Sequence, residues 1–211
     1  MKRLASGLLL LSLAACARGT QTNGPSTTYV PAEPGERHLK NIRQLTVGGN
    51  NAEAYFSISG EQLIYQRQNE VDAGCDQEYI MNIDGSNQRR ISNGYGRTTC
   101  GMFYADDKRV LYSSTFASDS ACPPPPDRSH GYVWPLGHLE IYTSKPDGSD
   151  LRPLTSNGAY NAEATLSPDG KRIIFTSTRD GDIELYTMNV DGTDVRRLTS
   201  RVGYDGGAWF S

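Results

Sequence analysis

Beyond residue 40 the chain alternates short apolar runs with turn residues, and within the runs apolar and polar side chains tend to alternate with a period of two. The segments 172–175 (RIIF) and 185–188 (LYTM) are typical strands of such a chain. No apolar stripe with the 3.6-residue period of a helix occurs downstream of the first sixteen residues. Asp-Gly pairs at 169–170 and 191–192 separate the runs, where a two-residue hairpin turn needs positive φ. The pattern predicts an all-β chain of short antiparallel strands.

The runs belong to an internal repeat. One shared block reads apolar strand, Asp-Gly turn and polar strand, and it occurs at 79–92, 141–155 and 185–199. A second block precedes each of these, at 52–66, 99–113 and 162–176, and a further copy begins at 203–211. The last two Asp-Gly turns are 44 residues apart, whereas the first two are 63 apart because the second copy carries an insertion.

Four strands in about 44 residues is the arithmetic of a β-propeller blade. A single blade cannot bury both of its faces, so neighbouring blades must stack around an axis. The sequence therefore predicts an incomplete propeller of four-stranded antiparallel blades over residues 41–211. Its expected parts are three blades and the start of a fourth, listed as about 52–92, 98–155, 161–199 and 203–211.

The segment 168–199, PDGKRIIFTSTRDGDIELYTMNVDGTDVRRLT, resembles the WD-like repeats of TolB-type propellers, which also occur in relatives of prolyl oligopeptidase. The first two copies depart from it, with Ser-Gly-Glu at 59–61 and Ala-Asp-Asp at 105–107 in place of Pro-Asp-Gly. The segment 42–46 (IRQLT) matches the fourth strand of a blade, which in closed propellers completes the last blade. Propellers of this family have six or seven blades, so we expect a truncated ring; the alternative is a six-bladed ring formed by two chains.

The first fifteen residues predict a bacterial lipoprotein signal. Lys2 and Arg3 precede an apolar run of ten residues, too short to span a bilayer. The run closes on Leu-Ala-Ala-Cys, which resembles a lipobox, so Cys16 is the expected lipid attachment site. Residues 16–40 then form a polar tether. Ala17 favours the outer membrane if the cell is Gram-negative; an ordinary signal peptide is the alternative.

Composition narrows the function classes. The 211 residues include 22 Gly, 11 Pro and 12 Tyr, with 36% hydrophobic and 21% charged residues and a net charge of −3. This profile excludes a coiled coil, a collagen and a polytopic membrane protein, and it offers no basic footprint for nucleic acid. We expect no cofactor.

Most of the residues with possible chemistry have ordinary explanations. Residues 189–194 mimic the start of a calcium loop but lack the closing Glu, so turn geometry explains them. No G-x-S-x-G motif occurs, and His38, His130 and His138 make a poor metal set, so we expect neither catalytic nor metal residues. The Arg pairs at 89–90 and 196–197 fit a solvated surface. Glu53 and Glu163 hold equivalent positions at the start of inner strands, where they either face the central channel or pair with the repeated Arg.

The insertion at 116–140 breaks the repeat. Four prolines at 123–126 favour a stiff polyproline II segment, and an aromatic and basic cluster follows. Loops on rigid scaffolds are common binding sites, so we expect a ligand face here, with a packing lid as the alternative. Its residues are Arg128, His130, Tyr132, Trp134 and His138.

With Cys16 assigned to lipid, Cys75, Cys100 and Cys122 remain, which predicts one disulfide and one free thiol. Strand directions place all three on one face of the propeller. We expect Cys100–Cys122 first and Cys75–Cys100 second, with the disulfide holding the insertion over the channel.

Three functions fit these observations. The first is a lipid-anchored propeller that binds a protein, a peptide or an envelope glycan. The second is the propeller part of a secreted hydrolase of the prolyl-oligopeptidase type, and the third, disfavoured by the few histidines, is a polysaccharide lyase.

Overall fold

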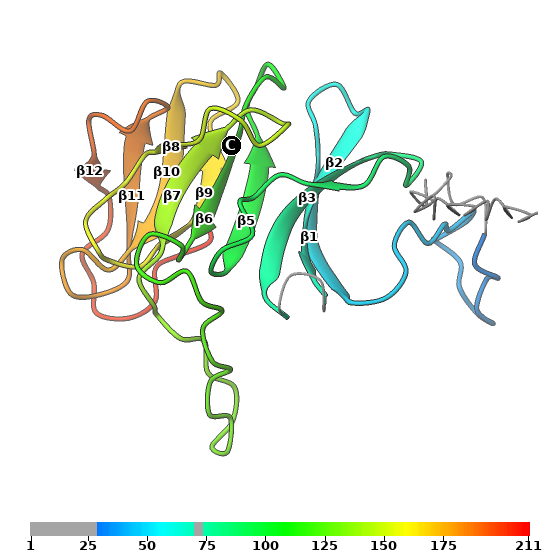
Figure 1. Cartoon of the computed structure of the whole chain (residues 1–211), viewed down its shortest axis with the longest axis horizontal. Coiled ribbons are helices and arrows are strands. Elements are labelled where there is room, and N and C mark those ends of the chain that lie inside the picture. The colour runs from blue at the N-terminus through cyan, green and yellow to red at the C-terminus, as the bar shows by residue number, and fades with distance from the viewer. Residues whose placement is uncertain (1–28, 70–73) are drawn as a thin grey trace, which may run out of the picture.

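The computed structural model describes residues 29–69 and 74–211 (Figure 1). The predicted signal peptide and Cys16 lie outside these residues. Within them the chain forms twelve strands and no helix, so the described part holds no helix able to cross a membrane.

The strands make three antiparallel sheets, each with its strands in chain order. Blade 1 consists of β1 (Asn50–Phe56), β2 (Gln62–Gln68), β3 (Asp76–Asn82) and β4 (Arg89–Arg90). Blade 2 consists of β5 (Thr98–Phe103), β6 (Val110–Ser114), β7 (Glu140–Ser144) and β8 (Arg152–Pro153). Blade 3 consists of β9 (Asn161–Leu166), β10 (Arg172–Ser177), β11 (Glu184–Asn189) and β12 (Arg196–Arg197). The predicted fold class is confirmed.

The blades stand side by side, as the cyan, green and orange sheets of Figure 1 show. The two main hydrophobic clusters join neighbouring blades. One joins β2 and β3 to β5 and β6 through side chains such as Ile64, Ile80 and Phe103, and the other joins blades 2 and 3 through Leu111, Ile141 and Ile173. Burying such a side chain contributes about 1.5–3 kcal/mol, so each blade depends on its neighbour.

Two faces of the stack differ in their connections. In each blade a hairpin turn joins the first strand to the second, and another joins the third strand to the fourth. These turns lie on one face of the stack, which we call the turn face. The links between second and third strands and between blades lie on the other, the link face. In Figure 1 the insertion of blade 2, residues 115–139, projects from the link face.

Residues 44–46 take the place of an outer strand from a preceding blade. The backbone of Leu45 lies against Gly85 of the first Asp-Gly turn, as Ile91 lies against Gly148 and Leu154 against Gly192. A Cβ on any of these glycines would stand 2.5–3.2 Å from the facing carbonyl oxygen, and each glycine has φ between 83° and 86°. Glycine is therefore required here for both conformation and close approach. This agrees with the sequence match of 42–46 to a fourth strand.

The structure explains why the second copy has Ala-Asp-Asp at 105–107 where the third copy has Pro-Asp-Gly. Asp107 has φ 56° where the third copy has Gly170 at 67°. Its carboxylate accepts hydrogen bonds from the backbone N–H groups of Ile58 (2.7 Å) and Ser59 (2.8 Å) in blade 1. The strain of a non-glycine residue in this region is offset by two charge-assisted bonds between blades.

Each inner strand carries an irregularity at one equivalent position. Glu53, Cys100 and Glu163 have φ of 48°, 60° and 54°, and Gly207, the matching residue of the fourth copy, has φ 63°. The register shifts beside the first three, as in a β-bulge. The bulges re-aim the side chains near the start of each inner strand.

Candidate functional site

The three inner strands and the segment 206–211 converge on a cavity of about 240 Å³, which we call the axial cavity. Tyr55 from blade 1 and Trp209 from the fourth copy meet across it with ring centroids 5.6 Å apart. The side chains and backbone lining it come from Glu53, Tyr55, Cys100, Gly101, Met102, Glu163, Ala164, Thr165, Gly207 and Trp209. All four bulge positions line it, three with the side chains of Glu53, Cys100 and Glu163 and the fourth with the backbone of Gly207.

Glu163 is held firmly in the axial cavity. Its carboxylate accepts hydrogen bonds from Thr176 Oγ1 (2.7 Å), Tyr204 Oη (2.9 Å) and the backbone N–H of Gly207 (2.8 Å). These bonds tie residues 204–207 to blade 3.

Glu53, at the equivalent position of blade 1, is exposed. Among the described residues its carboxylate has neither a hydrogen bond nor an ion pair. The pairing of both glutamates with the repeated arginines, the ordinary alternative, does not occur in the described chain. Arg196 pairs with Asp194 and Arg197 with Glu184. Both glutamates instead line the axial cavity.

An apolar cavity of about 390 Å³ continues the axial cavity toward the turn face and shares Tyr55, Met102 and Trp209 with it. Phe56 and Ile58 stand at its edge with 66% and 67% of their surface exposed. We call the two cavities together the axial groove. The groove is acidic within and apolar at its mouth.

A third carboxyl lies behind the wall of the axial cavity. Glu78 on β3 has no exposed surface, and neither carboxylate oxygen finds a hydrogen-bond partner among the described residues. Burial, with the nearby charge of Glu53, raises its pKa to about 8. Its carboxyl packs on Gly101, where an added Cβ would stand 2.4 Å from Oε2. Glu78 is not among the residues that the sequence pattern singled out.

Cys100 lines the axial cavity as a free thiol. Burial raises its pKa, and the charge of Glu53 raises it further. The thiol is thus protonated and a poor nucleophile at neutral pH.

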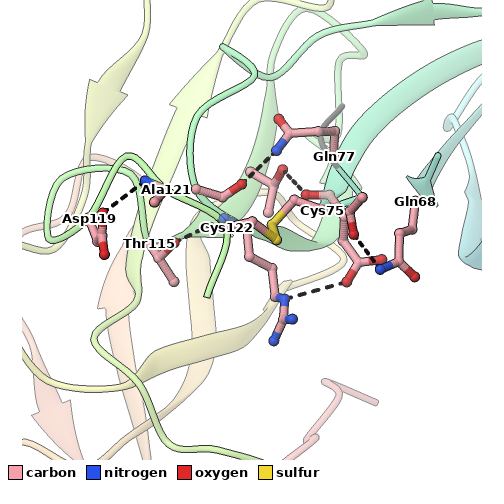
Figure 2. The surroundings of a disulfide bond; sticks show 12 residues. Gln68, Cys75, Gln77, Thr115, Asp119, Ala121 and Cys122 are labelled. Atoms are coloured by element: carbon pink, nitrogen blue, oxygen red, sulfur yellow. Dashed lines mark hydrogen bonds and ion pairs between the residues drawn. A yellow bond between two sulfur atoms is a disulfide. The ribbon is translucent and has the colours of Figure 1, made fainter. Parts of the chain in front are cut away.

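The predicted cysteine pairing is wrong. The structure joins Cys75 to Cys122, with Cα atoms 5.5 Å apart, and leaves Cys100 free (Figure 2). Both bridged cysteines lie in links between second and third strands, one in blade 1 and one in blade 2. Cys100 lies on the same side of the molecule but sits in a bulge that turns its thiol toward the axis. The disulfide therefore staples two blades and fixes the start of the insertion.

The five residues of the predicted ligand face do not converge on one cavity. Arg128 stacks over the ring of Tyr132, at 5.6 Å from its centroid, near the exposed end of the insertion. Trp134 Nε1 donates to Tyr160 Oη (3.1 Å), beside the start of β9. His130 is exposed, and His138 lines a separate cavity of about 580 Å³ that Phe116 and Tyr142 also line. Their role in binding stays a prediction.

The described residues contain no group of three His, Cys, Asp or Glu that could hold a metal ion. His38 is exposed in the tether. The calcium-like segment at 189–194 forms a hairpin turn in which Asp191 accepts hydrogen bonds from Thr193 Oγ1 (2.6 Å) and its backbone N–H (3.0 Å).

No protein-family model matches the chain. Among solved structures, a TolB protein of Agrobacterium tumefaciens superposes with a TM-score of 0.58 at 20% identity, over 77% of this chain and 53% of that one. TolB of Acinetobacter baumannii gives 0.56 at 23% identity, over 75% and 35%. A puromycin-hydrolysing peptidase of Mycobacterium tuberculosis gives 0.55 at 15% identity, over 78% and 24%. The likeness confirms the predicted TolB-like propeller fold, and the chain spans about half the length of the first of these proteins and less of the other two.

The disulfide should stabilise the stack of blades. The link closes a loop with a sequence separation of 47 residues, for which the chain-entropy relation gives about 4 kcal/mol. We expect Cys75→Ser to lower the free energy of unfolding by about this amount in denaturant titrations, and Cys100→Ser to have a much smaller effect. Peptide mapping without reductant should recover Cys75 linked to Cys122; recovery of Cys100 in a linked peptide would contradict the assignment.

Glu78 should make stability fall as pH rises. Its folded pKa of about 8 exceeds the ordinary 4.5, so the folded chain binds more protons than the unfolded chain between these values. Wild-type stability should therefore decline from about pH 4.5 to pH 8 and then level off. Glu78→Gln should remove up to about 5 kcal/mol of this decline, whereas Glu61→Gln, on an exposed turn, should keep it. An unchanged pH profile in Glu78→Gln is the opposing result.

Proposed function

We propose that this protein is a secreted, lipid-anchored propeller that binds a protein or peptide segment in its axial groove, with a cationic side chain in the axial cavity. The observation that carries the proposal is the meeting of Glu53 and Glu163 beside the Tyr55–Trp209 pair. Within residues 29–69 and 74–211, no cationic side chain lines this cavity.

A cationic group suits the axial cavity for two reasons. Two carboxylates can accept its N–H groups in charge-assisted hydrogen bonds. Tyr and Trp ring faces attract a cation within about 6 Å of the centroid. The apolar mouth, with Phe56 and Ile58, suits the flanking apolar residues of a segment that enters from the turn face. A lysine or arginine between apolar residues therefore matches the groove.

The envelope location rests on the sequence. Cys16 closes a segment that resembles a lipobox, and residues 16–40 are the proposed tether. The lipid would attach the protein to the membrane, in the outer membrane if the cell is Gram-negative. Labelling with a radioactive fatty acid, lost in Cys16→Ala, tests this part.

A second candidate is the propeller domain of a secreted hydrolase. It is favoured by the fold likeness to the puromycin-hydrolysing peptidase, of which this chain covers 24%. A nucleophile motif encoded beyond Ser211 would support it. Envelope glycans are a third class of ligand, for which the exposed rings of Tyr132 and Trp134 on the insertion are the proposed surface.

Binding in the axial groove can be tested with one fluorescent residue. The chain has two tryptophans, so Trp134→Phe leaves Trp209 as the sole indole. We expect the blocked tripeptide acetyl-Leu-Lys-Leu-amide to change Trp209 emission saturably. The matched peptide with norleucine in place of lysine should bind about tenfold more weakly, the loss expected for one charge-assisted bond of about 1.4 kcal/mol.

Two variants distinguish the effect of the Glu53 carboxylate in the groove from the effect of the protein's net charge. Glu53→Gln should reduce the affinity for the lysine peptide about tenfold without changing that for the norleucine peptide. Glu61→Gln removes the same charge from an exposed turn outside the groove and should leave both affinities unchanged. Equal binding of the two peptides, or no binding of either, contradicts the proposal.

A further inference from the structure

Glu78 replaces an apolar residue of the repeat. The equivalent residues of blades 2 and 3 are Ile141 and Leu185, counted back from each Asp-Gly turn. Ile141 is fully buried and belongs with Ala164 to the cluster that joins blades 2 and 3. The equivalent of Ala164 in blade 2 is Gly101.

The replacement is paired. Between blades 2 and 3, Ile141 and Ala164 occupy these two positions. Between blades 1 and 2, the same positions hold Glu78 and Gly101. A Cβ at position 101 would stand 2.4 Å from Glu78 Oε2 and 2.8 Å from its Cδ, so the carboxyl needs this glycine. Gly101 also lines the axial cavity. The carboxyl is thus separated from the cavity by a strand that has no side chain at the point of contact.

Among the residues that the structure describes, the groups that face Glu78 include no counter-ion. They are Glu53 and Tyr55 on β1, Asp76 on β3, Cys100 on β5 and Tyr112 on β6. The acidic neighbour Asp76 has a cationic partner of its own, Arg97, whose Nε lies 3.5 Å from its carboxylate. A buried carboxyl with two acidic neighbours and no ion-pair partner among the described residues holds its proton unless positive charge arrives.

We propose that Glu78 is a third carboxyl of the axial site, which holds a proton while the site is empty and releases it to solvent when a cationic group enters beside Glu53 and Glu163. This inference rests on the proposed function. No bond other than the carboxyl O–H breaks, and the negative charge left on Glu78 faces the bound cation through the backbone of Gly101.

Proton release makes affinity depend on pH. Between the ordinary carboxyl value and the raised pKa of about 8, the empty site is mostly protonated at Glu78. Linkage then requires the affinity for a permanent cation to rise with pH, by up to tenfold per unit for one proton. The lysine of a blocked peptide stays charged throughout this range.

Calorimetry measures the released proton directly. Acetyl-Leu-Lys-Leu-amide is titrated into the full chain at pH 7 in phosphate and in Tris, whose heats of protonation differ. We expect release of a substantial fraction of one proton per bound peptide, and an affinity that rises severalfold from pH 6 to pH 7.5. Glu61→Gln should behave as the wild type.

Two variants test the assignment to Glu78. Glu78→Gln should bind the peptide with no proton release and with an affinity that is flat with pH. The double variant Glu78→Leu/Gly101→Ala installs the pair of residues that blade 3 and the fourth copy carry, which safeguards folding, and it should also lose the release. Binding without proton release in the wild type, or undiminished release in either variant, overturns this inference alone. Absence of binding to the wild type contradicts the proposed function and this inference with it.

Discussion

The left-handed bulge near the start of each inner strand is the constraint on which the axial site depends. A regular strand would point alternate side chains into the gaps between blades. The bulge instead turns one residue per blade toward the axis, and Glu53, Cys100, Glu163 and Gly207 occupy that position. The thiol of Cys100 faces the backbone amide of Glu163, and the carboxylate of Glu163 accepts from the amide of Gly207. The second bulge thus contacts the third, and the third holds the fourth, which brings Trp209 against Tyr55.

The contacts between blades divide by function. Most are apolar, such as Ile141 against Ala164, and they hold the stack together. Polar contacts join the blades as well, and at Asp107 and Glu78, both between blades 1 and 2, an acidic residue replaces the residue that the third copy carries. Asp107 binds the turn of blade 1 and is fully satisfied, whereas Glu78 is buried and unsatisfied among the described residues. Burial of a carboxyl without a hydrogen-bond partner costs free energy, and the proposed release of its proton on ligand binding would depend on this cost.

The sequence predicted the elements better than the orientation of individual side chains. Repeats and Asp-Gly turns predicted the blades, and the match of residues 42–46 to the fourth strand of a blade predicted a strand-like N-terminal segment, because these features depend on spacing along the chain. The cysteine pairing failed because strand direction decides only the face of the propeller on which a residue lies. The bulge, which spacing does not show, turns Cys100 inward. An alignment of the third strands of the blades would have found Glu78, because it places this polar residue at the position of Ile141 and Leu185.

The central claim is that the segment after blade 3 docks on the inner strands and completes the axial cavity. Hydrogen exchange of the Gly207 amide tests it most directly, because this N–H lies outside the described strands and is held by Glu163 Oε2 at 2.8 Å. The account predicts exchange at least about tenfold slower than in an unstructured chain, and loss of this protection in Glu163→Ala while the amides of β10 and β11 stay protected. Exchange of Gly207 at the unstructured rate in the wild-type protein would show that the segment is not docked and would contradict the account.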